Sequence, residues 1–445
     1  MVAVLNRLKM SNLKGNFRIM RFRRRILPLV LVFLSLACSD GIEPLVDDDT
    51  GMLPNSDMIT GLTVQLDPSG YAPLSALLVL QTNAEVGVEL AVIGRNGNAS
   101  TVTQRFDDRG TDFELEVLGL YADHNNELQI RLLDANNNVV DTETVMITTT
   151  PLISDLPQIT IDVPSNATEP EFNFTNYFGF TSNFRPQRAF MFDQFGDIRW
   201  YLDFSSHPVL FNLFYDNGMT RLQNGNLLFG DGGSQSIYEI DLLGRIQDSW
   251  SLQGNDFHHH VIEKPNGNLL ATITDTTSPT VEDVIFEIDR NTGQFSTIWD
   301  LNISLDNTRR GWPTELADLN IDWFHANSLE YSPTDNEIIV SGRTQGIVKL
   351  NAQNEVSYIL APHNDWDALS GNGTELTQFL LTPLDSQNQA ITDMDVLLGN
   401  TNHPDFEWSW YQHSPILLPN GNLMVFDNGD NRNFINGGPY SRAVE

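Results

Sequence analysis

The sequence predicts an all-β protein in which an N-terminal β-sandwich is followed by a β-propeller. Apolar residues alternate with polar ones over short stretches that are separated by turn residues, and no helical period runs through the chain. A strand–turn–strand unit recurs along the second half. The 445 residues exceed what one hydrophobic core usually takes, so we expect two domains.

Residues 1–37 are predicted to be an export signal. They hold eight of the 25 Lys and Arg residues and no acidic residue, and a basic run at Arg21–Arg25 precedes an apolar stretch too short to span a bilayer. Cys38, the only cysteine, follows this stretch, so we predict cleavage and lipid attachment there. The alternatives are an ordinary secretory signal with an incidental thiol, and translation from Met20.

The chain after the signal is strongly acidic. Its 17 Lys and Arg residues stand against 58 Asp and Glu, a net charge of −41. Such a charge disfavours nucleic acids and anionic membranes as partners, so we expect membrane contact only through the lipid anchor. Residues 38–57 are predicted to form a lipidated, acidic, solvated tether.

Residues 58–152 are predicted to form the sandwich. Alternating apolar stretches occur at residues 62–66, 76–81, 87–93, 113–117, 127–133 and 139–147. The breaks between them include Asn96-Gly97, Asp107–Gly110 and Asn136–Asn138, which favour turns. A proline-bearing linker over residues 151–170 ends this domain.

Residues 170–445 repeat, and the repeat predicts the propeller. One strand–turn–strand unit covers residues 189–201 and recurs at 237–250, 285–299 and 347–360. The turn-opening residues Asp193, Asp241, Asp289 and Asn351 are 48, 48 and 62 residues apart. A second unit, Asn-Gly-Asn before an apolar strand, occurs at 224–226, 266–268 and 420–422. Two hairpins per period make the four strands of a propeller blade.

The repeat yields four to five complete blades. The last residues, Tyr440–Glu445, are predicted to open a further blade. We therefore expect an incomplete propeller that is truncated at its C-terminal end, because an unclosed ring leaves a sheet edge bare.

Histidine recurs at matching places in the repeat. His259 lies six residues before Pro265 of one Asn-Gly-Asn turn, and His413 lies six before Pro419 of another. His325 has a similar position before the strand at residues 337–341, allowing for a two-residue insertion. Because blades converge on a central channel, we predict that the three imidazoles share one site, whereas a single such histidine is more often a hydrogen-bonded core residue.

Three adjacent histidines, His258, His259 and His260, leave a choice open. Strand alternation sends His258 and His260 to one face and His259 to the other. A metal bound by His258 and His260 is an alternative, but no matching set of Asp, Glu or Cys ligands is evident, and we predict no metal.

The sequence resembles the bacterial aryl-sulfate sulfotransferases. The motifs are Phe257-His-His-His260, Asp322-Trp-Phe-His-Ala-Asn-Ser328, Ser341-Gly-Arg343, and Gln412-His-Ser-Pro415 ahead of Leu418-Pro-Asn-Gly-Asn422. They occur in family order, and Asp67-Pro-Ser-Gly-Tyr-Ala-Pro-Leu74 resembles the family's N-terminal sandwich domain. The resemblance implies a six-bladed propeller, continuing beyond residue 445, and sulfuryl transfer without a nucleotide sulfate donor or another cofactor.

Residue roles follow from this resemblance. His413 would be the nucleophile that is transiently sulfated, and His259 and His325 would bind the sulfuryl group beside Asn327 and Arg343. The residue chemistry agrees, because imidazole can be a nucleophile or a proton donor and a guanidinium forks onto sulfate oxygens.

The predicted function is ping-pong transfer of a sulfuryl group from an aryl sulfate donor to a phenol acceptor by an exported periplasmic, outer-membrane or cell-surface lipoprotein. Two alternatives remain: a non-catalytic propeller that presents a binding surface, and an aryl-sulfate hydrolase. Self-association into a homodimer is also left open.

Overall fold

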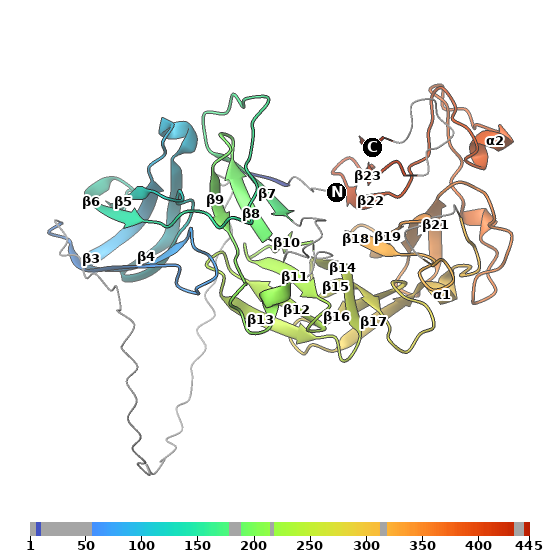
Figure 1. Ribbon diagram of the computed structural model, residues 1–445, viewed down its shortest axis with the longest axis horizontal. Helices are drawn as coiled ribbons and strands as arrows, with labels where there is room; N and C mark the ends of the chain where they lie inside the picture. Colours follow the sequence, from blue (N-terminus) through green and yellow to red (C-terminus); the bar gives the residue numbers. More distant parts are fainter. Residues whose placement is uncertain (1–5, 10–55, 178–187, 214–217, 312–317, 431–439) are drawn as a thin grey trace, which may run out of the picture.

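The computed structural model describes residues 6–9, 56–177, 188–213, 218–311, 318–430 and 440–445 (Figure 1). The predicted export signal and tether lie outside these ranges except for Asn6–Lys9, Ser56 and Asp57, and Cys38 lies outside them altogether. Among the described residues, no helix has the length and apolar character needed to cross a membrane.

The N-terminal domain is a five-stranded antiparallel sheet. Its strands are β2 (Ile59–Leu66), β3 (Ala76–Val92), β4 (Val102–Val117), β5 (Asn125–Leu133) and β6 (Val139–Thr148). The long strand β3 pairs with β4 on one side, and with β2 and then β5 on the other.

Two predicted details of this domain are wrong. The stretches 76–81 and 87–93 are parts of the one strand β3, and the predicted turn Asp107–Gly110 lies within β4. The pairing of β3 with β4 shifts register between Gln81 and Val88, so the extra residues bulge from the ladder without ending the strand.

Five blade-like sheets follow one another around an arc (Figure 1). The first contains β7 (Glu171–Tyr177), β8 (Arg188–Asp193) and β9 (Ile198–Tyr201), with β1 (Asn6–Lys9) paired to β7. The second is β10 (Thr220–Arg221), β11 (Leu227–Asp231), β12 (Ser236–Ile240) and β13 (Ile246–Ser251). The third is β14 (Asp256–Glu263), β15 (Leu269–Thr274), β16 (Val284–Ile288) and β17 (Phe295–Asp300).

The fourth sheet is β18 (Ala326–Ser332), β19 (Glu337–Gly342), β20 (Gly346–Leu350) and β21 (Val356–Leu360), and the fifth is β22 (His413–Leu417), β23 (Leu423–Asp427) and β24 (Arg442–Val444). The helices in the described part of the chain are short: α1 (Leu301–Ser304), α2 (Met394–Leu397) and 3-10 turns at Gly97–Ser100, Leu210–Asn212 and Thr377–Phe379. The predicted propeller-type, nearly all-β architecture is therefore confirmed.

The predicted hairpins are confirmed, and the turn chemistry explains the recurring residues. In the turn that joins β12 to β13, the Asp241 carboxylate accepts hydrogen bonds from the backbone N–H groups of Leu243 and Arg245. Asp193 and Asn351 do the same in their turns. An acidic or amide side chain is needed there because it satisfies turn N–H groups that no strand partner reaches.

Tryptophans tie consecutive blades together. The indole Nε1 of Trp200 in β9 donates to the carbonyl of Leu242 at 2.7 Å. Trp250 in β13 and Trp299 in β17 repeat the contact, donating to the carbonyls of Arg290 and Asn351, each at 2.8 Å. Each acceptor lies in the hairpin turn of the following blade. Three equivalent hydrogen bonds therefore hold consecutive blades in the same relative position.

The sandwich and the first blade share one core cluster of buried apolar residues, which includes Leu80 and Ile130 of the sandwich and Phe174 and Trp200 of the blade. Within this interface Arg199 is wholly buried. Its guanidinium is 2.8 Å from the Asp193 carboxylate, donates to sandwich backbone carbonyls and lies 3.5 Å from the Tyr121 ring centroid. A paired and hydrogen-bonded charge of this kind fixes the orientation of the two domains.

The prediction that Tyr440–Glu445 opens a further blade is wrong. Strand β24 pairs with β23 and is the third strand of the fifth sheet, in the place that β12 and β16 occupy in theirs. The Glu445 carboxylate accepts from the side chain of Asn422, as Glu287 accepts from Asn268 in the third sheet. The family-like motif Leu418–Asn422 predicted the turn before β23 but not the pairing of β24 with β23.

Candidate active site

The predicted histidines are presented by irregular inner strands. The pairing of β14 with β15 shifts register between Phe257 and Val261, and equivalent shifts interrupt β18 and β22 at their starts. Strand β14 packs against β18, and β18 packs against β22. His259 and His325 have φ angles of 54° and 56°, in the left-handed region that non-glycine residues rarely adopt. Such bulges re-aim side chains, here toward the space between blades.

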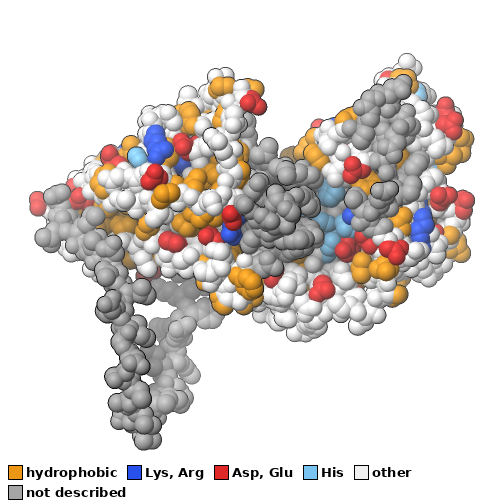
Figure 2. All heavy atoms as spheres, in the orientation of Figure 1, with side chains coloured by type: hydrophobic (Ala, Val, Ile, Leu, Met, Phe, Trp, Pro, Cys, Tyr) orange, Lys and Arg blue, Asp and Glu red, His pale blue; other side chains and the backbone are white. Residues whose placement is uncertain are grey.

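The structure brings His259, His325 and His413 together. The Nε2 atoms of His259 and His325 are 3.1 Å apart, and their ring centroids are separated by 5.1 Å. The His413 ring centroid lies 6.2 Å from that of His259. Figure 2 shows histidine side chains gathered in the hollow of the arc. Three imidazoles from separate blades therefore converge as expected.

The predicted alternation of His258, His259 and His260 is wrong. The rings of His258 and His259 both join the cluster, with centroids 4.0 Å apart, and His258 is also 4.8 Å from His325. His260 instead accepts a hydrogen bond at Nδ1 from the backbone N–H of Leu329. The bulge at His259 breaks the two-residue period, so His258 and His260 do not share a face.

Arg343 adds a cation to the cluster. Its Nη1 is 3.1 Å from Nε2 of His325, and its Nη2 donates to the Asp322 carboxylate at 2.8 Å. The predicted proximity of Arg343 to the histidines is thus present in the geometry.

Two carboxylates that the sequence did not single out complete the cluster. Asp322 lies 2.9 Å from Nδ1 of His325 and also pairs with Arg343. Glu282, in the segment before β16, has Oε2 in ion-pair contact with Nδ1 of His325 and 2.9 Å from Nε2 of His258. Asp322 falls within a family-like motif, but Glu282 belongs to no motif, and only its place before a buried strand was visible in the sequence.

The other motif residues hold His413 in place. The Asn327 amide donates to the carbonyl of Gln412 at 3.0 Å and accepts from the Ser328 hydroxyl, and the Ser328 hydroxyl in turn accepts from the backbone N–H of Ser414 at 2.7 Å. Ser341 also donates to the carbonyl of Gln412. Asn327 is buried and its contacts lead to the chain beside His413; its predicted contact with substrate stays a prediction.

The hydrogen bonds of His413 define its tautomer. Nδ1 lies 2.9 Å from the carbonyl oxygen of Tyr411, an acceptor only, so Nδ1 carries the proton and Nε2 has a free lone pair. The amide of Asn428 is 3.3 Å from the same Nδ1. Only the oxygen of this amide can accept a hydrogen bond from Nδ1–H of His413. With the Asn428 amide turned so that Oδ1 faces Nδ1, that oxygen gains a donor that it otherwise lacks.

The electrostatics divide the histidines into two kinds. Burial lowers the pKa of His413 to about 4 and holds the pKa of His259 well below its ordinary value, assisted by the neighbouring imidazoles and Arg343. Burial acts against protonation of His325 as well, but its contacts with Asp322 and Glu282 outweigh that effect and raise its pKa. The site therefore combines a neutral imidazole at His413 with one at His325 whose two carboxylate contacts favour protonation, against the Arg343 guanidinium 3.1 Å from its Nε2.

Two overlapping groups of side chains have ligand atoms within 4.8 Å of one another: His258, His259 and His325, and Glu282, Asp322 and His325. The His258–His260 pair considered from the sequence is not among them. Arg343 lies against the shared member, His325, and its fixed charge opposes a divalent cation there. Glu282 and Asp322 supply the carboxylate ligands that were not evident in the sequence, and Arg343, which also pairs with Asp322, acts against a metal at this place.

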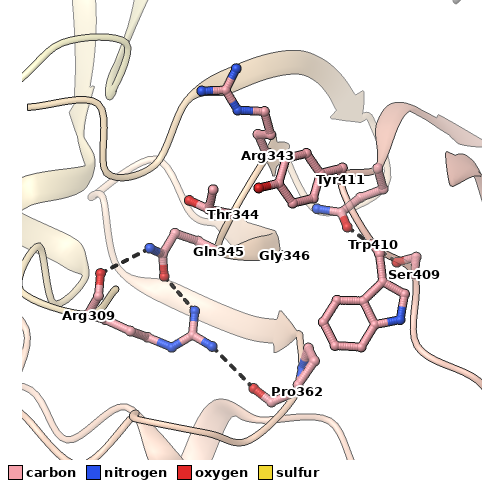
Figure 3. Close-up of a pocket in the computed structure, with 10 residues that line it drawn as sticks. Arg309, Arg343, Thr344, Gln345, Gly346, Pro362, Ser409, Trp410 and Tyr411 are labelled. Atoms are coloured by element: carbon pink, nitrogen blue, oxygen red, sulfur yellow. Dashed lines mark hydrogen bonds between the residues drawn. The ribbon is translucent and has the colours of Figure 1, made fainter. Parts of the chain in front are cut away.

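A pocket opens beside Arg343, lined by Arg309, Thr344, Gln345, Pro362, Trp410 and Tyr411, among others (Figure 3). The Arg309 guanidinium in its wall is bonded to neutral acceptors, among them Gln345 and the carbonyl of Asn364. The Arg343 guanidinium points away from this pocket. The pocket adjoins the histidine cluster, because Arg343, which contacts His325, and Tyr411, which contacts His413, both line it.

Known proteins match both parts of the chain. Residues 159–445 match the family model described as arylsulfotransferase (ASST), and residues 63–150 match the arylsulfotransferase Ig-like domain. The arylsulfate sulfotransferase AssT of Lelliottia amnigena is 26% identical, with 83% of this chain and 74% of the relative covered. The protein of the same name from Escherichia coli O6:H1 (strain CFT073) is 25% identical, covering 86% and 77%.

Solved structures show only distant similarity. Virginiamycin B lyase from Staphylococcus aureus superposes with a TM-score of 0.28 and 13% identity, covering 63% of this chain and 87% of that one. A protein of unknown function from Bacteroides caccae gives a TM-score of 0.29 at 10% identity, covering 61% and 93%. These scores are too low to support an argument.

Proposed function

Because the chain belongs to the arylsulfotransferase family, we propose that it moves a sulfuryl group from an aryl sulfate to a phenol through a covalent intermediate on His413. The observation that carries the proposal is the convergence of His259, His325 and His413 beside Arg343. The imidazoles of His259, His325 and His413 can each donate an N–H or offer a lone pair, and Arg343 carries a fixed positive charge beside them. A sulfate ester needs both a nucleophile and cationic groups around its oxygens.

In the first half-reaction Nε2 of His413 attacks the sulfur and the bond from sulfur to the aryl oxygen breaks. His413 is suited to this role because its pKa of about 4 leaves the ring neutral near pH 7, and its Nδ1–H is anchored on the carbonyl of Tyr411. Arg343 and His259 surround the sulfuryl oxygens, where charge is held in the transition state.

The leaving phenolate needs a proton. In this proposal His325 supplies it from Nε2, because its contacts with Asp322 and Glu282 favour the imidazolium form, and Nη1 of Arg343 turns from Nε2 of His325 to the sulfuryl oxygens when the substrate binds. In the second half-reaction the neutral His325 takes a proton from the acceptor phenol, whose oxygen attacks the sulfur on His413 and releases the imidazole. Both half-reactions balance in protons and need no added cofactor.

The test mixes a chromogenic aryl sulfate with a phenol acceptor. We expect release of the donor phenol together with sulfation of the acceptor, and loss of both in His413→Ala. His403→Ala, which removes a histidine outside the cluster, is the matched control and is expected to retain transfer. Full transfer by His413→Ala would reject the proposal, and phenol release that is independent of the acceptor would instead select a hydrolase.

We also propose that the protein acts outside the cytoplasm, held at a membrane by a lipid on Cys38. The support is the sequence alone, a basic and apolar leader ahead of the sole cysteine, and cleavage there would remove strand β1 from the first blade. Cys38→Ser is expected to move the protein from the membrane to the soluble fraction, and unchanged membrane association would contradict the anchor.

A further inference from the structure

Glu282 is the one charged group of the cluster that comes from the third blade, whereas Asp322, His325 and Arg343 come from the fourth or the loop leading into it. Its backbone carbonyl accepts from the N–H of Ala326 at 2.8 Å, which joins the two blades next to His325. Its φ angle is 61°. A glutamate in the left-handed region costs about 1–3 kcal/mol and persists where the surrounding structure requires it. The Glu282 carboxylate lies against two imidazoles, those of His258 and His325.

The two carboxylates act differently on His325. Asp322 makes the directional hydrogen bonds to Nδ1, at 2.9 and 3.1 Å. Oε2 of Glu282 contacts the same nitrogen from another blade and lies 2.9 Å from Nε2 of His258, so its charge is shared by two imidazoles.

The charge balance shows why a second carboxylate is needed. Asp322 also accepts from Arg343 at 2.8 Å, so its single charge serves two cations when His325 is protonated. Each of these groups is largely buried, and unbalanced like charges are costly in such surroundings. Glu282 supplies the missing negative charge, and no arginine or lysine pairs with it among the described residues.

We propose that Glu282 is a positioning residue that keeps the proton on His325 across the blade boundary and thereby sets the alkaline limit of turnover. This inference rests on the proposed function, because the proton on His325 is the one given to the leaving phenolate. The charged and titratable groups that face His325 are Asp322, Glu282 and Arg343, with His258, His259 and His413 completing the surroundings.

The test compares Glu282→Gln and Glu282→Asp with the parent enzyme. Glutamine keeps the shape and removes the charge, so the apparent pKa of the alkaline limb of kcat/KM is expected to fall by about 1–3 units. At a pH between the alkaline limb of Glu282→Gln and that of the parent, the variant is expected to be slower than the parent by about tenfold or more, whereas the two rates converge at lower pH. Aspartate keeps the charge and is expected to restore most of the alkaline limb.

Glu330→Gln is the matched control. Glu330 lies in β18, is partly buried and accepts from backbone N–H groups outside the histidine cluster, so its loss is expected to leave the alkaline limb in place. A uniform loss of rate in Glu282→Gln with an unchanged alkaline limb would overturn the inference and leave sulfuryl transfer standing.

A second readout does not depend on turnover. In protein labelled with ¹⁵N-histidine, the His325 resonance is assigned by its loss in His325→Gln, and its titration is followed in the parent and in Glu282→Gln. A lower midpoint in Glu282→Gln is the expected result. An unchanged midpoint overturns the role of Glu282, while absence of transfer by the parent enzyme would count against the proposed function alone.

Discussion

Replacing Arg343 by lysine separates the charge of this side chain from its shape. The guanidinium reaches two partners through two nitrogens: Nη1 lies 3.1 Å from His325, and Nη2 lies 2.8 Å from Asp322. A single ammonium cannot occupy both places, and the Asp322 carboxylate is the stronger attraction. The Nη1 group, which turns from His325 to the sulfuryl oxygens in the proposed mechanism, would then have no counterpart, while the net charge of the site is kept.

The expected magnitude follows from that loss. One donor aimed at developing charge is worth about 3–4 kcal/mol, or about 10²–10³ in kcat. The measurement is steady-state transfer from a chromogenic aryl sulfate to a phenol, with the fold checked by circular dichroism. Arg310→Lys is the control, because Arg310 is exposed and donates mainly to nearby backbone carbonyls. Retention of the parental kcat within about threefold by Arg343→Lys would refute the assignment.

Three further outcomes follow from the structure. Transfer should rise with pH through about 4, as His413 loses its proton, and fall at a pH above about 6.5, as His325 loses its own; a flat pH profile would exclude these two groups. Burial lowers the pKa of His260 to about 4, so the neutral ring contributes to the free energy of unfolding above a pH of about 6.5, and this contribution is lost as the pH falls toward 4. In urea unfolding, His260→Asn should reduce the loss of stability on acidification by about 3 kcal/mol, and a pH dependence identical to that of the parent would contradict this. Trp250→Phe removes the indole bond to the Arg290 carbonyl and should lower the free energy of unfolding by about 1–3 kcal/mol, whereas an unchanged unfolding midpoint would show that the bond between blades is dispensable.

The repeating part of the fold was predictable because its turns need particular side chains. Asp241 and its counterparts satisfy turn N–H groups, so their spacing reported the hairpins directly. The place of β24 was not predictable in the same way. A strand of three residues has no pattern that distinguishes the third strand of one blade from the first of the next, and only its pairing with β23 decides.

The site was predictable as far as it repeats. His259 and His413 stand at equal offsets from similar turns, and the structure brings both beside His325. The participation of His258 was missed because a bulge breaks the alternation of a regular strand. Glu282 was missed because it stands at no repeated offset from a turn and because its partner His325 comes from another blade, a relation that no spacing along the chain expresses.

The central claim is that His413 itself carries the sulfuryl group. Enzyme treated with an aryl sulfate in the absence of acceptor, quenched in alkali and digested, is expected to yield a sulfated peptide containing His413, and the modification should disappear when a phenol is added before the quench. Turnover without any modified peptide, or with the sulfuryl group on a different residue, would contradict the account.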